Sequence, residues 1–301
     1  DYGLVGMLAV FIAISQSFID SGFSQALIRK QDRTEVDNST VFYFNIVLGL
    51  LFYCLLFVSA PLIAKFYKEP LLVDLTRVLG LSVLINSFVI VQRALLTVHI
   101  DFKTQAKAAL VASIVSGAVG LYMAATGFGV WALVAQQIVA SSMTSILLWT
   151  LNRWLPDVAF SMESFKQLFG FGSFILCSNL INTFCNNVQG LLIGRFFTSA
   201  TMGYYTQARK LEEVASHSFS TVVDQVSYPI LSKFQSDNAA MQSVLYKLTT
   251  ALAYVTFPLM LVLILVAEPL ITLLYGDKWL PCVPYFQILC VAGIAICLQG
   301  T

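Results

Sequence analysis

Runs of about twenty apolar residues, the length a helix needs to cross a bilayer, recur along the whole chain between short polar segments. The pattern predicts eight membrane spans and a ninth at the end of the chain. Their expected ranges are Tyr2–Ile28, Thr40–Phe66, Leu72–Leu96, Ala106–Thr126, Val130–Trp149, Phe165–Ile193, Gly203–Ser232, Leu245–Leu274 and Pro284 to the end. We therefore expect an all-α, polytopic membrane protein with eight or nine transmembrane helices present.

The seventh span differs from the others because it carries charge. At about 100° per residue, one side of that helix collects polar side chains. They are Arg209, Lys210, Glu213, Ser216, His217, Ser220, Thr221 and Asp224. Such a helix could lie on the membrane surface, but its charges are of both signs. We therefore expect its polar face to line a wet cavity inside a helix bundle.

Three further spans carry polar side chains at helical spacing. The first span has Ser17, Asp20, Ser21 and Ser24; the sixth has Asn179, Asn182, Asn186 and Gln189; the third has Ser82, Asn86 and Arg93, with Arg77 near its outer end. A charged side chain facing lipid costs several kcal/mol, so these faces are predicted to point inward. A bundle with a polar seam follows from this pattern.

An internal repeat indicates two lobes. The segment PLIAKFYK (Pro61–Lys68) matches PLITLLYG (Pro269–Gly276), and the surrounding spans match in order. The predicted domains are a first lobe over residues 1–153, an inter-lobe linker with an amphipathic turn over 154–172, and a second lobe over 173–301. The repeat also predicts that the first lobe lacks its first helix and the second lobe its last two.

Composition narrows the functional class. The chain is 58% hydrophobic and 11% charged, which is too apolar for one soluble core, and its formal net charge of +1 argues against a nucleic-acid partner. Alternate loops carry ten Lys and Arg residues against four in the others, so the loop around Arg29 and Arg33 is predicted to be cytoplasmic. The six cysteines lack metal-ligand spacing, and we interpret them as buried small hydrophobic residues.

Signals for an enzyme are weak. The chain has no GxGxxG, GxxxxGK[ST], HExxH or GxSxG motif, and His99 and His217 are its only histidines. The structural interpretation of the charges is that loop cations set topology, while Arg209, Glu213 and His217, spaced four apart, neutralise one another. A membrane transferase without such motifs stays an alternative. Duplicated lobes with polar faces favour a transporter over an enzyme.

Several segments, taken in order, resemble a known family. They are FIDSGFSQALIRK (Phe18–Lys30), FGFGSF, LLIGRFFTSATMGYYTQARKLEEV (Leu191–Val214) and YPILSKFQSD (Tyr228–Asp237). The chain is similar to Wzx-type oligosaccharide-lipid flippases of the MATE-like multidrug/oligosaccharidyl-lipid/polysaccharide exporter (MOP) superfamily. The resemblance covers the whole chain as an internal fragment. It implies a MATE-like two-lobed bundle in the bacterial cytoplasmic (inner) membrane, with lobes that open alternately to either side.

The resemblance also implies a substrate, a polyprenyl-pyrophosphate-linked oligosaccharide used in lipopolysaccharide or surface polysaccharide biosynthesis. Candidate contacts to the diphosphate are the cations Arg209, Lys210, Arg195, Arg77 and Arg93. Candidate contacts to sugar hydroxyls are Asn179, Asn182, Asn186 and Gln189. Candidate carriers of a coupling H⁺ or Na⁺ are Asp20, Glu213, His217 and Asp224. No cofactor or bound metal is expected; membrane lipid and a polysaccharide-assembly machinery are the expected partners.

Other functions stay open from the sequence. Within the superfamily, a cationic-drug antiporter would bury net acidic charge, whereas here the cations within the spans roughly match the acids. A peptidoglycan-precursor flippase would share both fold and substrate chemistry. A membrane glycan polymerase or ligase would carry a large outer loop with Arg and Asp or His, and the predicted outer loops are short.

Overall fold

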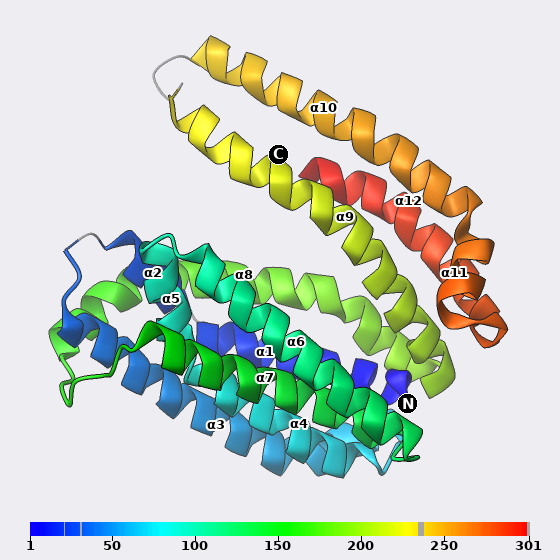
Figure 1. Cartoon of the computed structure of the whole chain (residues 1–301), viewed down its shortest axis with the longest axis horizontal. Coiled ribbons are helices and arrows are strands. Elements are labelled where there is room, and N and C mark those ends of the chain that lie inside the picture. Colours follow the sequence, from blue (N-terminus) through cyan, green and yellow to red (C-terminus); the bar gives the residue numbers. More distant parts are fainter. Residues whose placement is uncertain (21, 31, 234–237, 300–301) are drawn as a thin grey trace. The chain divides into compact units, whose positions relative to one another are not determined.

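The computed structural model describes the backbone of residues 1–20, 22–30, 32–233 and 238–299. Within these ranges it describes the side chains except those of 217–245, 247–249, 251–252 and 295–299. The described elements are all helices, which confirms the predicted class (Figure 1). They are α1 (Tyr2–Asp20), α2 (Phe23–Arg29), α3 (Glu35–Tyr67), α4 (Leu72–Ser87), α5 (Ile90–Val98), α6 (Phe102–Ala125), α7 (Val130–Asn152), α8 (Met162–Phe196), α9 (Ser199–Lys233), α10 (Asn238–Leu265), α11 (Ala267–Tyr275), the 3₁₀ helix η1 (Asp277–Cys282) and α12 (Val283–Gln299).

Each predicted span corresponds to one helix or to a broken pair. Six helical segments of the described residues are long and apolar enough to cross a membrane, and a seventh if α10 and α11, bent by 71°, form one span. The bend follows from Pro269 in the first turn of α11, because proline has no N–H to bond the carbonyl four residues earlier. The first and third spans are likewise interrupted, between α1 and α2 and between α4 and α5.

The chain divides into two compact units, Asp1–Ser199 and Ala200–Thr301. In the first unit, α1 packs against α8, α3 against α4, and α6 against α7 (Figure 1). Helix α8 is therefore part of the first unit, although the internal repeat assigns most of it to the second lobe. The predicted lobe boundaries stay a prediction, since they describe an evolutionary and functional division rather than the densest packing.

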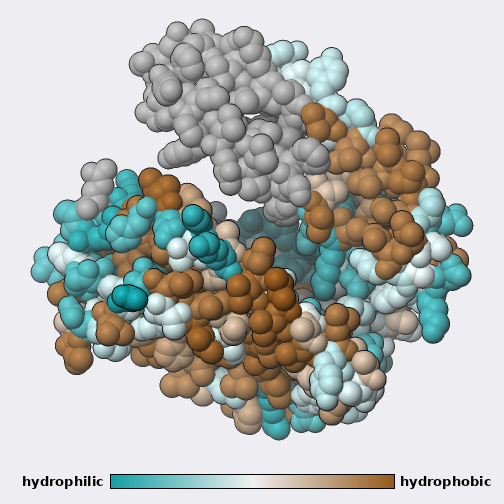
Figure 2. Space-filling model, in the orientation of Figure 1, coloured by the Kyte–Doolittle hydropathy of each residue, from teal (hydrophilic) through white to brown (hydrophobic). Residues whose placement is uncertain are grey.

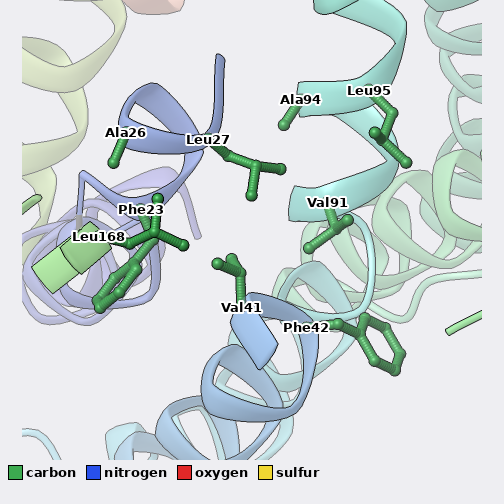
Figure 3. Close-up of a cluster of buried hydrophobic side chains, with 9 residues drawn as sticks. All are labelled: Phe23, Ala26, Leu27, Val41, Phe42, Val91, Ala94, Leu95 and Leu168. Carbon is green, nitrogen blue, oxygen red and sulfur yellow. The ribbon is translucent and has the colours of Figure 1, made fainter. Parts of the chain in front are cut away.

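A hydrophobic cluster joins four helices of the first unit near the start of α3. Figure 3 shows side chains of α2 and α5 facing one another, with residues of α3 and α8 completing the group. Its buried members are Phe23, Ala26, Leu27, Val41, Phe42, Val91, Ala94, Leu95 and Leu168. Trp149 and Trp154 from the end of α7 and the following segment pack against it. The cluster fixes α2 and α5 against the long helices.

The start of α3 is held by a capping box. The Thr34 side chain accepts a hydrogen bond from the backbone of Asp37, and Asp37 accepts one from the Thr34 backbone. The Asp37 carboxylate is 1% exposed and also forms an ion pair with Lys30 at 2.8 Å. These contacts anchor the loop between α2 and α3 to the end of the bundle.

The core of the second unit lies between α9, α10, α11, η1 and α12. It contains Ala208, Met260, Ala267, Ile271, Cys282, Phe286 and Cys290. Burial raises the pKa of the Cys282 thiol to about 11, so this thiol stays protonated. The prediction of buried cysteines holds for Cys282 and Cys290 but is wrong for Cys54, Cys177 and Cys185, which are exposed. The side chain of Cys297 lies outside those that the structure describes. In a membrane protein an apolar neighbourhood does not imply burial, because apolar side chains also face lipid.

The outer surface of the first unit is correspondingly apolar. Figure 2 shows broad hydrophobic areas across its visible face and more hydrophilic residues at the end where α3 begins. Val58 and Leu62 of α3 and Leu121 of α6 are examples of large apolar side chains that are more than two-thirds exposed. Such a surface is expected for helices solvated by lipid tails.

The turn between α1 and α2 gives a test of this packing. Gly22 has φ +66°, and a Cβ there would lie 2.4 Å from the backbone oxygen of Gly172 in α8. We expect Gly22→Ala to destabilise the protein by about 1–3 kcal/mol, through strain and overpacking. Thermal unfolding in detergent measures the change. Gly117→Ala is the matched control, because its Cβ would meet nothing within 4 Å; equal unfolding midpoints for the two variants would contradict the close approach of α8.

Candidate functional site

Two charged residues predicted for the site lie at neighbouring helix breaks in the first unit. Asp20 is the last residue of α1, and Arg93 belongs to α5; both side chains are exposed. The positive charge of Arg93 acts on the Asp20 carboxylate. The structure therefore brings together one ion-coupling candidate and one phosphate-binding candidate.

The four amide residues of α8 form one polar row. Asn182, Asn186 and Gln189 are exposed and Asn179 is half-buried. The Asn186 amide donates a hydrogen bond to the Asn182 side-chain oxygen at 2.9 Å, which orients both side chains along the helix. Each amide offers both a donor and an acceptor. A row of such groups on a membrane-spanning helix is suited to a ligand with many hydroxyls.

Polar side chains of the first, third and sixth spans meet inside the first unit, with Thr183 rather than a predicted amide making the contact of the sixth span. The Ser17 hydroxyl of α1 lies 2.7 Å from the Thr183 hydroxyl of α8. The Asn86 amide of α4 donates a hydrogen bond to Gln16 of α1 at 3.2 Å. Helix α1 thus packs between α4 and α8 through polar contacts. These bonds satisfy side chains that would otherwise be unpaired in an apolar environment.

Two of the predicted cavity cations lie against aromatic rings. The Arg77 guanidinium of α4 lies 4.5 Å from the centre of the Phe57 ring, and the Arg195 guanidinium of α8 lies 5.2 Å from that of Phe66. Both rings belong to α3. Cation–π contacts of this kind stabilise a guanidinium at the membrane boundary. Arg77 and Arg195 therefore have a structural role in the first unit, whether or not they contact a substrate.

The remaining candidates belong to α9 in the second unit. Arg209 donates a hydrogen bond to Glu213 at 2.7 Å, one helical turn away, as the four-residue spacing indicated. The Lys210 side chain is exposed. His217 and Asp224 lie on the same helix, but their side chains are outside those that the structure describes. Arg209, Lys210 and Glu213 thus form a short charged segment on α9.

Glu212 is a candidate that the sequence analysis passed over in favour of Glu213. Its side chain is 5% exposed, and a Cβ added to Gly293 of α12 would lie 2.5 Å from its Oε1 atom. The signal lay in the spacing, because Glu212 is four residues after Ala208, which is fully buried. Glu212 was not singled out because several charged residues surround it in the sequence of α9.

The sequence of this chain is similar to those of known proteins. A family described as "Polysaccharide biosynthesis protein" matches residues 1–284. The chain belongs to this family. It is 33% identical over 285 residues to the teichuronic acid biosynthesis protein TuaB of Bacillus subtilis and 24% identical over 301 residues to the lipopolysaccharide biosynthesis protein WzxC of Escherichia coli. These matches cover 93% and 97% of the chain but 58% and 60% of the relatives, so the chain spans less than two thirds of their length.

A solved structure shares the fold. It is an inward-facing multidrug resistance MATE family transporter of the MOP superfamily. The match covers 98% of this chain and 71% of the transporter chain, with a TM-score of 0.69 and 16% sequence identity. The predicted MATE-like helical fold is confirmed, and the family member is a multi-pass protein of the bacterial inner membrane. Among the described residues, no group of three or more His, Cys, Asp or Glu side chains could hold a metal ion.

The contact between α1 and α8 can be tested by crosslinking. With the native cysteines replaced by alanine, the pair Ser17→Cys and Thr183→Cys is expected to form a disulfide on mild oxidation, because the two hydroxyl groups lie 2.7 Å apart. Gel mobility after cleavage between the two positions measures the bond. The control pair is Ser17→Cys with Asn186→Cys, about one turn further along α8. Preferential crosslinking of the control pair would contradict the register of the helices.

Proposed function

We propose that the protein is a transporter, not an enzyme, which flips a lipid-linked oligosaccharide across the bacterial inner membrane by alternating access. Membership of a polysaccharide biosynthesis family and the MATE-like fold support this proposal. Its relatives include proteins named for teichuronic acid and for lipopolysaccharide biosynthesis, which supports a role in glycan assembly. The observation that carries it is the exposed amide row of α8, a sugar-compatible surface on a membrane-spanning helix.

The headgroup contacts follow from the charges. A sugar diphosphate needs cationic donors, and Arg is suited to bidentate contacts with phosphate. The candidates are Arg93, Arg209, Lys210, Arg77 and Arg195. Of these, Arg209 pairs with Glu213, and Arg77 and Arg195 are stacked on rings of α3. The polyprenyl tail stays in the bilayer, where it is soluble. The substrate partner is therefore amphipathic, with a polar head inside the protein and an apolar tail in lipid.

Coupling to an H⁺ or Na⁺ gradient is assigned to the carboxylates. Asp20 is the first candidate because it is exposed and within the field of Arg93, so a change in its charge alters the local attraction. Glu213 is the second, and its pairing with Arg209 links ion binding to a phosphate-binding cation. His217 and Asp224 complete the set. We further propose that the protein works with other proteins of a polysaccharide-assembly machinery and that it does not bind nucleic acid.

The amide row gives the first functional prediction. Replacing Asn182 and Asn186 together by alanine is expected to weaken oligosaccharide binding about thirtyfold, since each lost hydrogen bond is worth roughly 1 kcal/mol. The measurement is flipping of a fluorescent lipid-linked oligosaccharide in proteoliposomes. Replacing Phe184, exposed on the same helix, by alanine is the control. Unchanged flipping by the double variant would exclude the row as the sugar site, and absence of flipping by the unaltered protein would contradict the function itself.

The cations of α9 give the second functional prediction. Arg209→Ala and Lys210→Ala are each expected to lower flipping about tenfold or more while insertion into the membrane is unchanged, because a charge-assisted phosphate contact is worth roughly 1.5–3 kcal/mol. Export of surface glycan in cells and protein level in membranes are the two measurements. Lys278→Ala, an exposed cation of η1, is the control. Normal export by both α9 variants would remove these residues from the site.

A further inference from the structure

The segment between α7 and α8, residues 153–161, is fastened to the first unit. We name it the strap. Its Trp154 side chain donates a hydrogen bond to Glu35 at 2.7 Å, and its Trp154 carbonyl accepts one from Gln92 of α5 at 3.0 Å. The internal repeat predicts that this region is part of a linker between lobes. These hydrogen bonds hold the strap in one conformation against the first unit.

Further bonds run from the strap backbone to buried hydroxyl groups of α3. The Asp157 N–H donates to the Ser39 hydroxyl at 2.9 Å, and the Ser161 N–H donates to the Thr40 hydroxyl at 3.0 Å. Ser39 and Thr40 are both fully buried. The Ser161 hydroxyl then caps α8. The strap is therefore held at both ends and in the middle by the first two turns of α3.

The opposite side of the strap is apolar and uncovered. Leu155 is 73% exposed, Val158 100%, Phe160 52% and Met162, the first residue of α8, 57%. Between them, Trp154, Pro156, Ala159 and Ser161 are half-buried, so inward and outward positions mostly alternate. Because the inward groups are bonded to α3, the outward side chains cannot turn in to bury themselves. The fold holds this apolar row away from the bundle.

The position of the strap identifies what covers it. It follows directly on α7 and is bonded to the first two turns of α3, and both of these helices are long and apolar enough to span the membrane. The strap therefore lies at the level where two spans end. Its apolar row continues the exposed apolar surface of α7, which includes Ile146 and Leu151. An exposed apolar surface on a helix that is long and apolar enough to span the membrane is expected to face lipid.

The strap could bind lipid through electrostatic attraction to anionic headgroups or through burial of its apolar side chains, and its charges distinguish between the two. Arg153 and Lys166 are exposed at the two ends of this region, but Asp157 and Glu163 are exposed within it. The four charges cancel, so the region has no net attraction to anionic headgroups. Attachment to lipid must come from burial of the apolar side chains.

We propose that the strap is a membrane-interface anchor, whose residues Leu155, Val158, Phe160 and Met162 insert into the boundary between headgroups and acyl chains of the leaflet at the end of the bundle where α3 begins. In the predicted orientation this is the cytoplasmic leaflet. The anchor fixes the connection to α8 at the membrane surface and on the first unit. Movement of the remaining chain then occurs beyond α8 rather than at the strap. The proposal does not depend on which substrate is moved.

The test places a fluorescent bimane label at Val158→Cys, in the protein with its native cysteines replaced by alanine and reconstituted in lipid nanodiscs. Val158 makes no packing contact, being fully exposed, so the variant should fold. We expect quenching of the label by phosphatidylcholine carrying a nitroxide high on its acyl chain, and protection from aqueous iodide. The control is Asp32→Cys, an exposed position in the loop between α2 and α3. Its label should be quenched by iodide and not by lipid.

Lipid composition completes the test. Quenching at position 158 should be the same in phosphatidylcholine alone and with added phosphatidylglycerol, and should persist in high salt, because apolar burial does not depend on ionic strength. Quenching by iodide would overturn the proposal in favour of a surface facing water. Protection from both quenchers would overturn it in favour of a protein partner. Dependence on phosphatidylglycerol would overturn the apolar mechanism.

Discussion

The buried carboxylate of Asp37 is the interaction on which the end of the first unit depends. It pairs with Lys30 and accepts a hydrogen bond from the backbone of Thr34. Removing one partner of a buried pair typically costs about 3–5 kcal/mol, because the other charge is left unsatisfied. One carboxylate thus joins the α2–α3 loop to the start of α3, the most apolar spanning helix of the unit.

The same end of the bundle explains why the connection to α8 does not behave as a free linker. Its polar groups are bonded to Glu35, Ser39 and Thr40, while the hydrophobic cluster beneath holds α2, α3, α5 and α8 together (Figure 3). Backbone groups near a membrane must be hydrogen-bonded within the protein or to water, and α3 provides the acceptors. A rigid attachment and an outward apolar row follow from the same bonds.

Within the membrane, polar side chains are arranged by the same requirement. Ser17, Asn86 and Thr183 find partners on neighbouring helices, Arg209 finds Glu213 on its own, and Arg77 and Arg195 find aromatic rings. The amide row of α8 carries its own Asn186–Asn182 hydrogen bond and is exposed at Asn182, Asn186 and Gln189. Its exposure and its repeated amide groups are the reason for placing sugar contacts on α8.

The sequence alone determined the helical class, the order of the spans and the family, because hydropathy and local motifs are properties of consecutive residues. It also indicated the Arg209–Glu213 pair, since a four-residue spacing brings two side chains together within one helix. Only the tertiary structure decided that the charge of Arg93 acts on Asp20, that Glu212 is buried while Glu213 is paired, and that three cysteines are exposed. Those outcomes depend on which helices lie side by side, and in a bilayer hydrophobicity cannot distinguish a face turned to lipid from a face turned to another helix.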